Sequence, residues 1–453
     1  MNEISQCEMD TISERNIQKG MHPVFYARQP TQGASLPSHF SFSSLRAIEI
    51  CPRRWWLLHS HYADLKGNYP QTVSDSSIRG TIVHNTLERL GKALKVAGSP
   101  TPGSGGFLAV LREFQPRSII LQERQKEINA LASNPRVHIA LLRERIGADA
   151  CLNAFKRLFR LAYGSLGGVD TVLPHLPTKR QDFIGQPSAS STDQTSTGSW
   201  RRDGSGADGQ VPCPAFLPEQ SMTLDQPPLM GQMDLVETDE EGDRLTEYKT
   251  GKEKPEHEQQ LRFYTLLWWR QTGRLFRWSR ILYADQEPKE FAGLTLADIQ
   301  CEEVTIQERV NAATHALQQS LPPAIPQVET CMFCPVRQLC ADYWTAPTTI
   351  PLRLPLVDSS GKDGPEILLR DMEIVFTRGV IQNGELLTQN LGFPLSLPLL
   401  ESKPVRMSIP PRFLPGDLST VRRVRLLGVA LHIEMNTIRV QTTIRSEVFW
   451  AEN

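Results

Sequence analysis

The chain has 453 residues, in which 49 lysines and arginines nearly balance 50 aspartates and glutamates. A single hydrophobic core stops growing near about 250 to 300 residues, so this length predicts two or three domains. The balanced charge excludes a polybasic chain, and the sequence has neither a basic leader nor an apolar run of about 18 residues that would predict a membrane span. We therefore expect a soluble, cytoplasmic protein with no membrane contact, in which local patches make any contact with DNA.

The first half of the chain is helical by its apolar spacing. Residues 1–35 are polar without a sustained period and predict a flexible arm. Serines that precede an apolar-periodic run predict a capped helix from Ser41 to near Cys51, and a second helix is indicated from Ser77 to about Val96. Helical spacing resumes over residues 107–166. The polar stretch 187–210 cannot bury enough apolar surface to order itself, which predicts a disordered insertion.

Strands are predicted beyond the insertion. The runs Met230–Thr238 and Arg244–Thr250 are joined by a turn-prone acidic segment and predict two short paired strands. A helix is expected from about Glu256 to Thr272, with Gly273 as its C-cap. The apolar run Phe276–Tyr283 predicts another strand.

The last part of the chain passes from a helical pattern to a proline-rich segment and then to strand-like alternation. A helix is predicted over Val304–Leu321, where two prolines end it. Residues 346–355 are proline-rich and predict a linker. Beyond it the sequence alternates as strands do, and Leu426–Glu434 and Thr437–Phe449 flank a short turn like a hairpin. These patterns predict a small β-rich C-terminal domain.

Three charged residues fall on the two short strands. Asp234 lies in the first strand, whereas Glu247 and Lys249 are two residues apart and face the same side of the second. If the strands pair, the carboxylates meet where a hard cation such as Mg²⁺ or Mn²⁺ could bind. Such a cation can activate a water for attack on a phosphodiester, and Lys249 would orient that water or stabilise the developing charge. By spacing alone, however, such residues more often form a solvated face.

Three further residues indicate a function only in combination with these three. Gln260 and Tyr264 are four residues apart on the helix that follows and therefore share one face. The plain alternative is a solvated Gln260 and a core-packed Tyr264. His84, on the earlier helix, would by itself more often be an ordinary histidine than a ligand.

Four of the eight cysteines follow one pattern. Cys331, Cys334 and Cys340 have the spacing C-x2-C-x5-C, and Cys51, far upstream, is the candidate fourth member. Four thiolates suit either an iron-sulfur cluster or structural zinc, and unrelated free cysteines are the third alternative. Spacing leaves the choice of metal open.

The charged and aromatic motifs resemble those of the RecB-type branch of the PD-(D/E)XK nucleases. The run from Gly231 to Asp234 matches its GxxD strand, and the run from Glu247 to Lys249 matches its (D/E)xK strand. The run from Gln260 to Tyr264 matches its QxxxY helix. The segment from Arg79 to Glu88 is similar to its RGxxxHxxLE helix. The four motifs occur in the family's order, and the main departure is the long insertion ahead of the GxxD strand.

This resemblance implies a role for each motif position. The implied metal ligands are His84, Asp234, Glu247 and the backbone carbonyl of Tyr248. Lys249 is implied to be the catalytic lysine, and Gln260 and Tyr264 to position Lys249 or the DNA backbone. No motif position is degenerate, which favours an active enzyme.

The cysteine pattern resembles the iron-sulfur nucleases, namely the AddB subunit of bacterial recombination machines and the CRISPR-associated exonucleases. In those proteins one cysteine precedes the histidine helix and three follow the QxxxY helix, as Cys51 and the C-x2-C-x5-C segment do here. The resemblance favours a 4Fe-4S cluster over structural Zn²⁺. Its expected role is structural, because it would close a loop of roughly 280 residues.

Together these patterns predict an α/β chain. Residues 36–345 should form a restriction-endonuclease-like core, a mixed sheet flanked by helices and clasped by the cluster, and residues 356–453 a β-rich domain, OB-like in one interpretation. We expect a metal-dependent deoxyribonuclease, either an exonuclease or a flap or single-strand endonuclease. It would act on DNA with a single-stranded end in repair, recombination or antiviral defence.

The sequence also bears on partners. It contains no G-x4-G-K-[ST] loop, so a separate helicase or a defence or repair partner would have to open long duplexes. The alternative function is a non-cleaving DNA-binding or scaffold subunit of a nuclease-helicase or defence complex.

Overall fold

The structure is a computed structural model. It describes residues 25–26, 28–63, 65, 69–134, 136–137, 139–163, 215–345, 352–354, 367–375, 380–382, 385–388, 405–408, 421–433, 438–442 and 446–452. The predicted insertion, residues 187–210, lies outside the described residues, as do residues 1–24 of the predicted arm. Within that arm, however, Phe25–Tyr26 form strand β1, which pairs in parallel with β14 (Glu447–Glu452) near the end of the chain.

A five-stranded mixed sheet is built from the middle of the chain, residues 215–292. Its order is β2-β3-β4-β5-β6, in which β4 and β5 are parallel and the other neighbours antiparallel. The strands are β2 (Ala215–Asp225), β3 (Pro228–Asp239), β4 (Gly242–Lys249), β5 (Phe276–Tyr283) and β6 (Lys289–Ala292). The sequence predicts the three middle strands. It does not indicate β2, in which Pro218 interrupts the pattern, or β6, which has only four residues.

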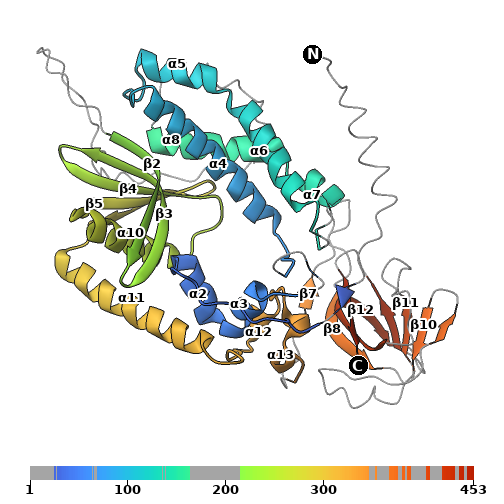
Figure 1. Ribbon diagram of the computed structural model, residues 1–453. Helices are drawn as coiled ribbons and strands as arrows, with labels where there is room; N and C mark the ends of the chain where they lie inside the picture. Colours follow the sequence, from blue (N-terminus) through green and yellow to red (C-terminus); the bar gives the residue numbers. More distant parts are fainter. Residues whose placement is uncertain are drawn as a thin grey trace, which may run out of the picture.

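Helices cover both faces of this sheet (Figure 1). One face packs against a layer made of α4 (Asp75–Val96), α5 (Gly105–Phe114), α6 (Pro116–Leu131), α7 (Ile139–Arg145) and α8 (Ala148–Tyr163). The other face packs against α10 (Glu256–Thr272), which α11 (Leu296–Leu317) covers in turn. No helix in the described part of the chain combines the length and apolarity that a membrane crossing requires.

The two helices of the second layer test the predicted helix boundaries. Helix α10 has the predicted bounds, and Gly273 follows it in the left-handed conformation with φ of 71°. Helix α11 differs, because it begins at Leu296 rather than Val304 and ends at Leu317 rather than Leu321. The early start has a local cause: Thr295 and Asp298 form a reciprocal capping box.

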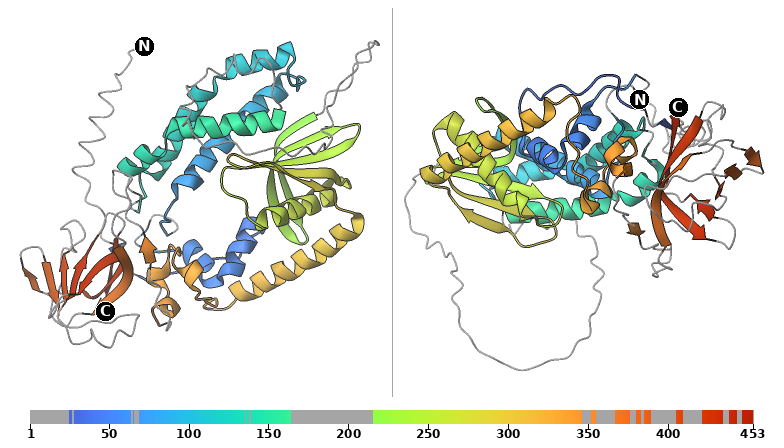
Figure 2. Two further views of the ribbon diagram at one scale, coloured as in Figure 1. Left: turned by 180° about the vertical axis from the view of Figure 1, so that it is seen from behind. Right: turned by 90° about the horizontal axis from the view of Figure 1, so that it is seen from below.

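Short helices connect the two ends of the molecule (Figure 2). They are α2 (Phe42–Ile50), α3 (Pro52–His59), α12 (Val328–Cys331), the 3₁₀ helix η1 (Arg337–Leu339) and α13 (Ala341–Thr345). Ser41 caps α2 as predicted, since its hydroxyl accepts from the Ser44 N–H at 3.1 Å. Arg53 then ties α3 to α13 through a contact of 3.1 Å with Asp342.

A second sheet, nine-stranded within the described residues, lies at the far end. It follows the order β1-β14-β12-β13-β11-β10-β9, and β8 joins β12 and carries β7. Its further strands are β7 (Leu352–Leu354), β8 (Ile367–Val375), β9 (Val380–Gln382), β10 (Glu385–Thr388), β11 (Val405–Ser408), β12 (Val421–Ile433) and β13 (Ile438–Gln441). The predicted hairpin is present, because β12 and β13 pair with Ile433 opposite Ile438. The single strand predicted over Thr437–Phe449 is wrong, because β13 and β14 are separate strands, and β7 lies inside the predicted linker.

Arg136 joins three segments that are distant in sequence. Its side chain is 0% exposed, and its Nε and Nη2 donate to the Glu447 carboxylate at 2.7 and 2.8 Å. Its Nη1 donates to the carbonyl of Pro70 at 2.9 Å and also to that of Pro335. The guanidinium also lies 5.7 Å from the ring centre of Phe449. One buried arginine therefore links the start of the α4 segment, the cysteine segment and the second sheet.

Candidate active site and thiol site

Pairing of β3 with β4 brings the predicted carboxylates together. Leu235 lies opposite Thr246, so Asp234 and Glu247 occupy neighbouring positions on the two strands. Asp234 Oδ2 accepts the backbone N–H of Tyr248 at 2.7 Å. On β4, Lys249 Nζ donates to Glu247 Oε1 at 2.7 Å, as their two-residue spacing on a strand allows.

Helix α4 places His84 beside these carboxylates. His84 Nδ1 lies 3.2 Å from Asp234 Oδ1. Two glycines let the helix approach the sheet closely. A Cβ at Gly80 would lie 2.9 Å from Thr250 Oγ1, and one at Gly91 would lie 2.7 Å from Pro218 Cβ. The histidine motif therefore meets the strand motifs across the layer interface.

The two residues of the QxxxY motif support Lys249 from the other side. Lys249 Nζ donates to Gln260 Oε1 at 2.8 Å, and Gln260 Nε2 donates to the Tyr264 hydroxyl at 2.7 Å. The glycine of the GxxD motif makes room for this arrangement. A Cβ at Gly231 would lie 2.6 Å from Leu267 Cδ1 and 3.0 Å from Tyr264 Cε1. The structure thus brings all the sequence-predicted active-site residues into one cluster.

Two carboxyl groups lie side by side in this cluster, and their pKa values are shifted in opposite directions. Glu247 is 3% exposed, and its Oε2 is buried without a hydrogen-bond partner among the described residues. Burial, followed by the charge of Asp234, raises the pKa of Glu247 to about 7. Burial acts to raise the pKa of Asp234 as well, but the charge and hydrogen bond of His84 outweigh it and hold that pKa below its usual value. A divalent cation here would partner Oε2 and offset both carboxylates.

Comparison with known proteins agrees with this geometry. The sequence profile of the PD-(D/E)XK nuclease superfamily matches residues 39–341. The chain belongs to the PD-(D/E)XK nuclease superfamily. Members of this superfamily are in general metal-dependent nucleases that use Mg²⁺ or Mn²⁺ and act on DNA. The five-stranded mixed sheet flanked by helices fits the restriction-endonuclease-like fold. A search of curated proteins finds no match.

In this PD-(D/E)XK domain the side chains of the candidate ligands contact other groups of the protein. No three histidine, cysteine or acidic side chains in the described ranges are arranged to hold one metal ion as they stand. His84 contacts Asp234, and Lys249 occupies one oxygen of Glu247. Cation binding would therefore exchange these contacts for ligand bonds.

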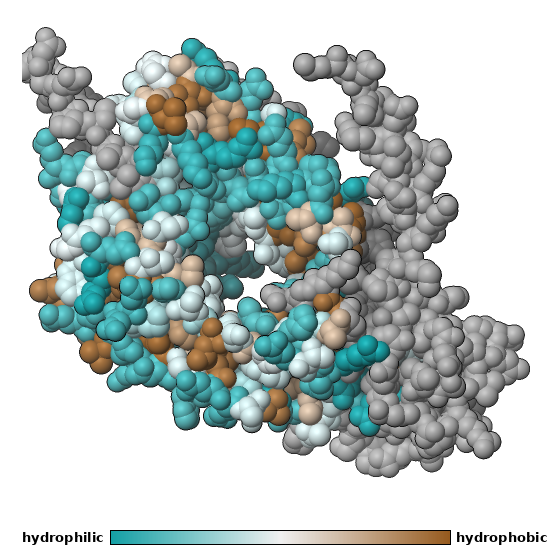
Figure 3. Space-filling model, in the orientation of Figure 1, coloured by the Kyte–Doolittle hydropathy of each residue, from teal (hydrophilic) through white to brown (hydrophobic). Residues whose placement is uncertain are grey.

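The cluster is recessed but open to solvent. The side chains of His84, Asp234 and Lys249 are 27%, 15% and 20% exposed. Figure 3 shows a hollow in the middle of the molecule, between the α4 layer and the α2 and α3 segment. A substrate must therefore reach into the domain to meet these residues.

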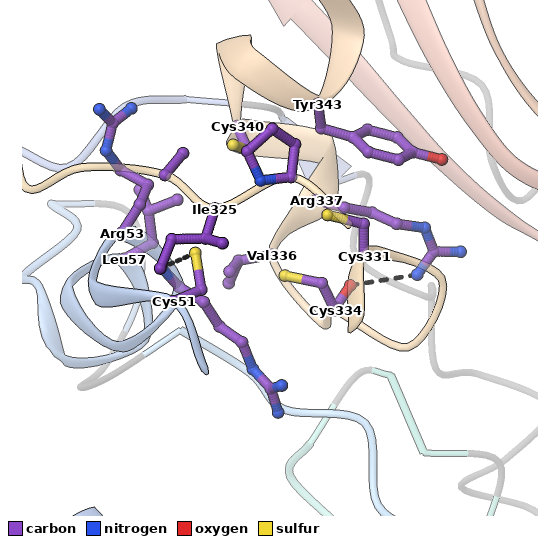
Figure 4. Close-up of a pocket in the computed structure, with 13 residues that line it drawn as sticks. Cys51, Arg53, Leu57, Ile325, Cys331, Cys334, Val336, Arg337, Cys340 and Tyr343 are labelled. Atoms are coloured by element: carbon purple, nitrogen blue, oxygen red, sulfur yellow. Dashed lines mark hydrogen bonds between the residues drawn. The ribbon is translucent and has the colours of Figure 1, made fainter. Parts of the chain in front are cut away.

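The four predicted cysteines line one pocket (Figure 4). Cys51 comes from the junction of α2 and α3, and the other three come from the segment around η1. The Cys51 sulfur accepts the backbone N–H of Arg54 at 3.4 Å. Such an N–H donor stabilises thiolate, which is the form that binds metal.

The surroundings of these thiols are apolar and positive. Burial raises the pKa of the Cys334 thiol to about 11 and raises that of Cys340 as well. Bound metal would replace those thiol protons. Arg53, Arg54 and Arg337 also line the pocket. Arg53 pairs with Asp342 and Arg337 with Asp371, whereas the charge of Arg54 acts to lower the pKa of Cys334 and so favours its thiolate. Arg54 was not predicted to belong to this site, although it lies only three residues after Cys51.

Replacing Gly231 with alanine should displace Tyr264, because the added methyl group overlaps its ring and Leu267. We expect a loss of about 1 to 3 kcal/mol in the free energy of unfolding, and slower cleavage because Gln260 loses its support. Thermal unfolding and initial cleavage rates measure the two effects. Gly105→Ala is the matched control, because its Cβ would meet nothing within 4 Å. Equal behaviour of the two variants would contradict this account.

Proposed function

We propose that the chain is a metal-dependent DNA nuclease of the RecB-type branch, an exonuclease or a flap or single-strand endonuclease. The observation that carries this proposal is the unpartnered, buried Oε2 of Glu247 beside Asp234 and Lys249. A buried carboxylate oxygen without a donor is costly unless a cation completes it. A merely solvated charged face does not have this property.

The active-site residues have different proposed roles in metal binding and catalysis. The proposed ligands of Mg²⁺ or Mn²⁺ are His84, Asp234, Glu247 and the backbone carbonyl of Tyr248. When bound, the cation would supply positive charge at the attacked phosphate and promote ionisation of a water. Lys249 contributes a fixed ammonium, which Glu247 and Gln260 both orient. Tyr264 fixes the Gln260 amide, so it acts through Gln260 on Lys249.

We infer that the substrate is DNA with a single-stranded end. The recessed position of Lys249 and Asp234 supports this, because a flexible single strand can bring a phosphate to partly buried side chains more easily than a stiff duplex can. The separate helicase, the repair or defence partner and the OB-like character of the C-terminal domain stay predictions. The pathway is likewise a prediction.

We further propose that the four cysteines hold a 4Fe-4S cluster, with structural Zn²⁺ as the alternative. Support comes from their shared pocket, the backbone N–H of Arg54 that donates to Cys51 Sγ, and the Arg54 guanidinium in the pocket lining. Anaerobically purified protein should be brown and contain iron and acid-labile sulfide in equal amounts. Colourless protein that contains zinc would contradict the cluster.

End-labelled single-stranded and duplex DNA test the nuclease proposal directly. We expect cleavage with Mg²⁺ or Mn²⁺ and none in excess chelator, because the carboxylate cluster needs a hard cation. The positions of the labelled products give the polarity and separate exonuclease from endonuclease action. Tight binding without cleavage under every metal would instead support the scaffold alternative.

A further inference from the structure

His257 lies beside the active-site cluster but belongs to none of its motifs. It is in the first turn of α10, three residues before Gln260 and seven before Tyr264, which places all three on one face of the helix. Burial and the positive charge of Lys249 lower its pKa, so the ring is neutral near pH 7. His257 is therefore a neutral imidazole within the electrostatic reach of the proposed catalytic lysine.

Tyr283 fixes the orientation of this ring. The Tyr283 hydroxyl lies 3.0 Å from His257 Nδ1, and Tyr283 is 1% exposed and pairs with Lys249 across β4 and β5. Burial raises the pKa of Tyr283 to about 12, so the hydroxyl keeps its proton. Among the described residues His257 Nδ1 is its one hydrogen-bond partner, and a buried tyrosine hydroxyl needs an acceptor.

The hydroxyl therefore donates to Nδ1. A neutral imidazole that accepts at Nδ1 carries its proton on Nε2, on the side of the ring away from Tyr283. No side chain or carbonyl in the described ranges accepts a hydrogen bond from Nε2, and His257 is partly exposed. Lys252 and Lys254 on the loop just before it alternate with Glu253 and Glu256, so the local charge is mixed and the N–H itself is the feature that selects a ligand. A fixed N–H donor that no described group of the protein satisfies suits an anionic oxygen.

We propose that His257 Nε2 donates a hydrogen bond to a phosphate of the bound DNA strand next to the one that is cleaved. Tyr283 would then be a positioning residue that acts through His257. This inference rests on the proposed nuclease function and adds a DNA-contacting residue to it. The contact would hold the strand in register with Lys249 and would apply to any base sequence, because it reads the backbone.

Two substitutions of His257 separate this contact from simple packing. The amide of His257→Gln can place an N–H near the position of Nε2, whereas that of His257→Asn reaches only the position of Nδ1. Binding of a single-stranded oligonucleotide to the full chain is measured in Ca²⁺, which supports binding without rapid cleavage. We expect His257→Asn to weaken binding by about 10-fold or more, as for loss of a hydrogen bond to a charged group, and His257→Gln to retain most of the affinity. Tyr283→Phe should give an intermediate loss.

Oligonucleotides with single uncharged methylphosphonate linkages identify the contacted phosphate. We expect wild type to lose affinity at one linkage where His257→Asn loses none. Glu258→Gln, an exposed neighbour on the same helix turn, is the control, and unfolding midpoints confirm that each variant is folded.

The outcomes separate this inference from the nuclease proposal. If wild type cleaves DNA in a Lys249-dependent way but His257→Asn has the wild-type affinity and linkage profile, the inference alone is wrong. If wild type binds DNA with the His257-dependent profile but never cleaves it, the contact stands and the nuclease proposal fails. A wild-type chain that does not bind DNA overturns both.

Discussion

Replacing Lys249 with alanine should reduce DNA cleavage by about 10²- to 10³-fold, as does removal of one preorganised hydrogen-bond donor from other active sites. The ammonium is held by Glu247 Oε1 at 2.7 Å and by Gln260 Oε1 at 2.8 Å, so its position is set before substrate arrives. We expect the variant to stay folded, because the Lys249 side chain belongs to neither hydrophobic core and the raised pKa of Glu247 lets that carboxyl take up a proton when the ion pair is lost. Single-turnover cleavage of end-labelled DNA with saturating Mg²⁺ measures the effect.

Lys252→Ala is the matched control for this variant. Lys252 is exposed on the loop just after β4. Its replacement therefore removes a positive charge near the site without removing a contact to Glu247 or Gln260. We expect at most a modest, salt-dependent loss of binding from the control. Equal cleavage rates for Lys249→Ala and wild type, with both folded, would remove Lys249 from the mechanism.

Replacing Cys51 with alanine should remove the bound metal and destabilise the nuclease domain. Cys51 is the one thiol of the pocket that lies upstream of the sheet, so its loss opens a loop of roughly 280 residues. A cross-link that closes a loop of this size contributes on the order of 5 kcal/mol. We expect the unfolding midpoint to fall by about 10 °C. Iron and zinc analysis and thermal unfolding of the anaerobically purified variant measure the two effects.

Cys301→Ala controls for the loss of a thiol as such, because Cys301 is exposed on α11 and lies outside the pocket. It should keep the metal content and midpoint of wild type. A Cys51→Ala protein that retains both would show that the cysteines do not act as one site. In that case the free-cysteine alternative would replace the clasp.

Local patterns predicted the parts of the site that depend on local geometry. The spacing of Glu247 and Lys249 on a strand, and of Gln260 and Tyr264 on a helix, fixes which side chains share a face before any tertiary contact forms. Gly273 signals the end of α10 for a similar reason, because a left-handed residue is easiest for glycine. The order of these motifs then sufficed to place them in one domain.

Other features could not be predicted from local sequence patterns, because they depend on contacts between residues that are distant in the chain. The edge strands β2 and β6 have no clear alternation of their own and exist because β3 and β5 offer partners. The tie between His257 and Tyr283 depends on how α10 lies against β5, which no spacing within either element specifies. Likewise, the pairing of Arg136 with Glu447 spans 311 residues.

Arg136 affects how the protein unfolds. Removing one partner from a buried ion pair costs about 3 to 5 kcal/mol, because the remaining charge is stranded away from water. Arg136 would be stranded if the second sheet melted alone, since Glu447 would leave with it. The two ends of the molecule should therefore unfold in one calorimetric transition. Heat or a mutation that destabilises the second sheet should also destabilise α4, the helix that carries His84.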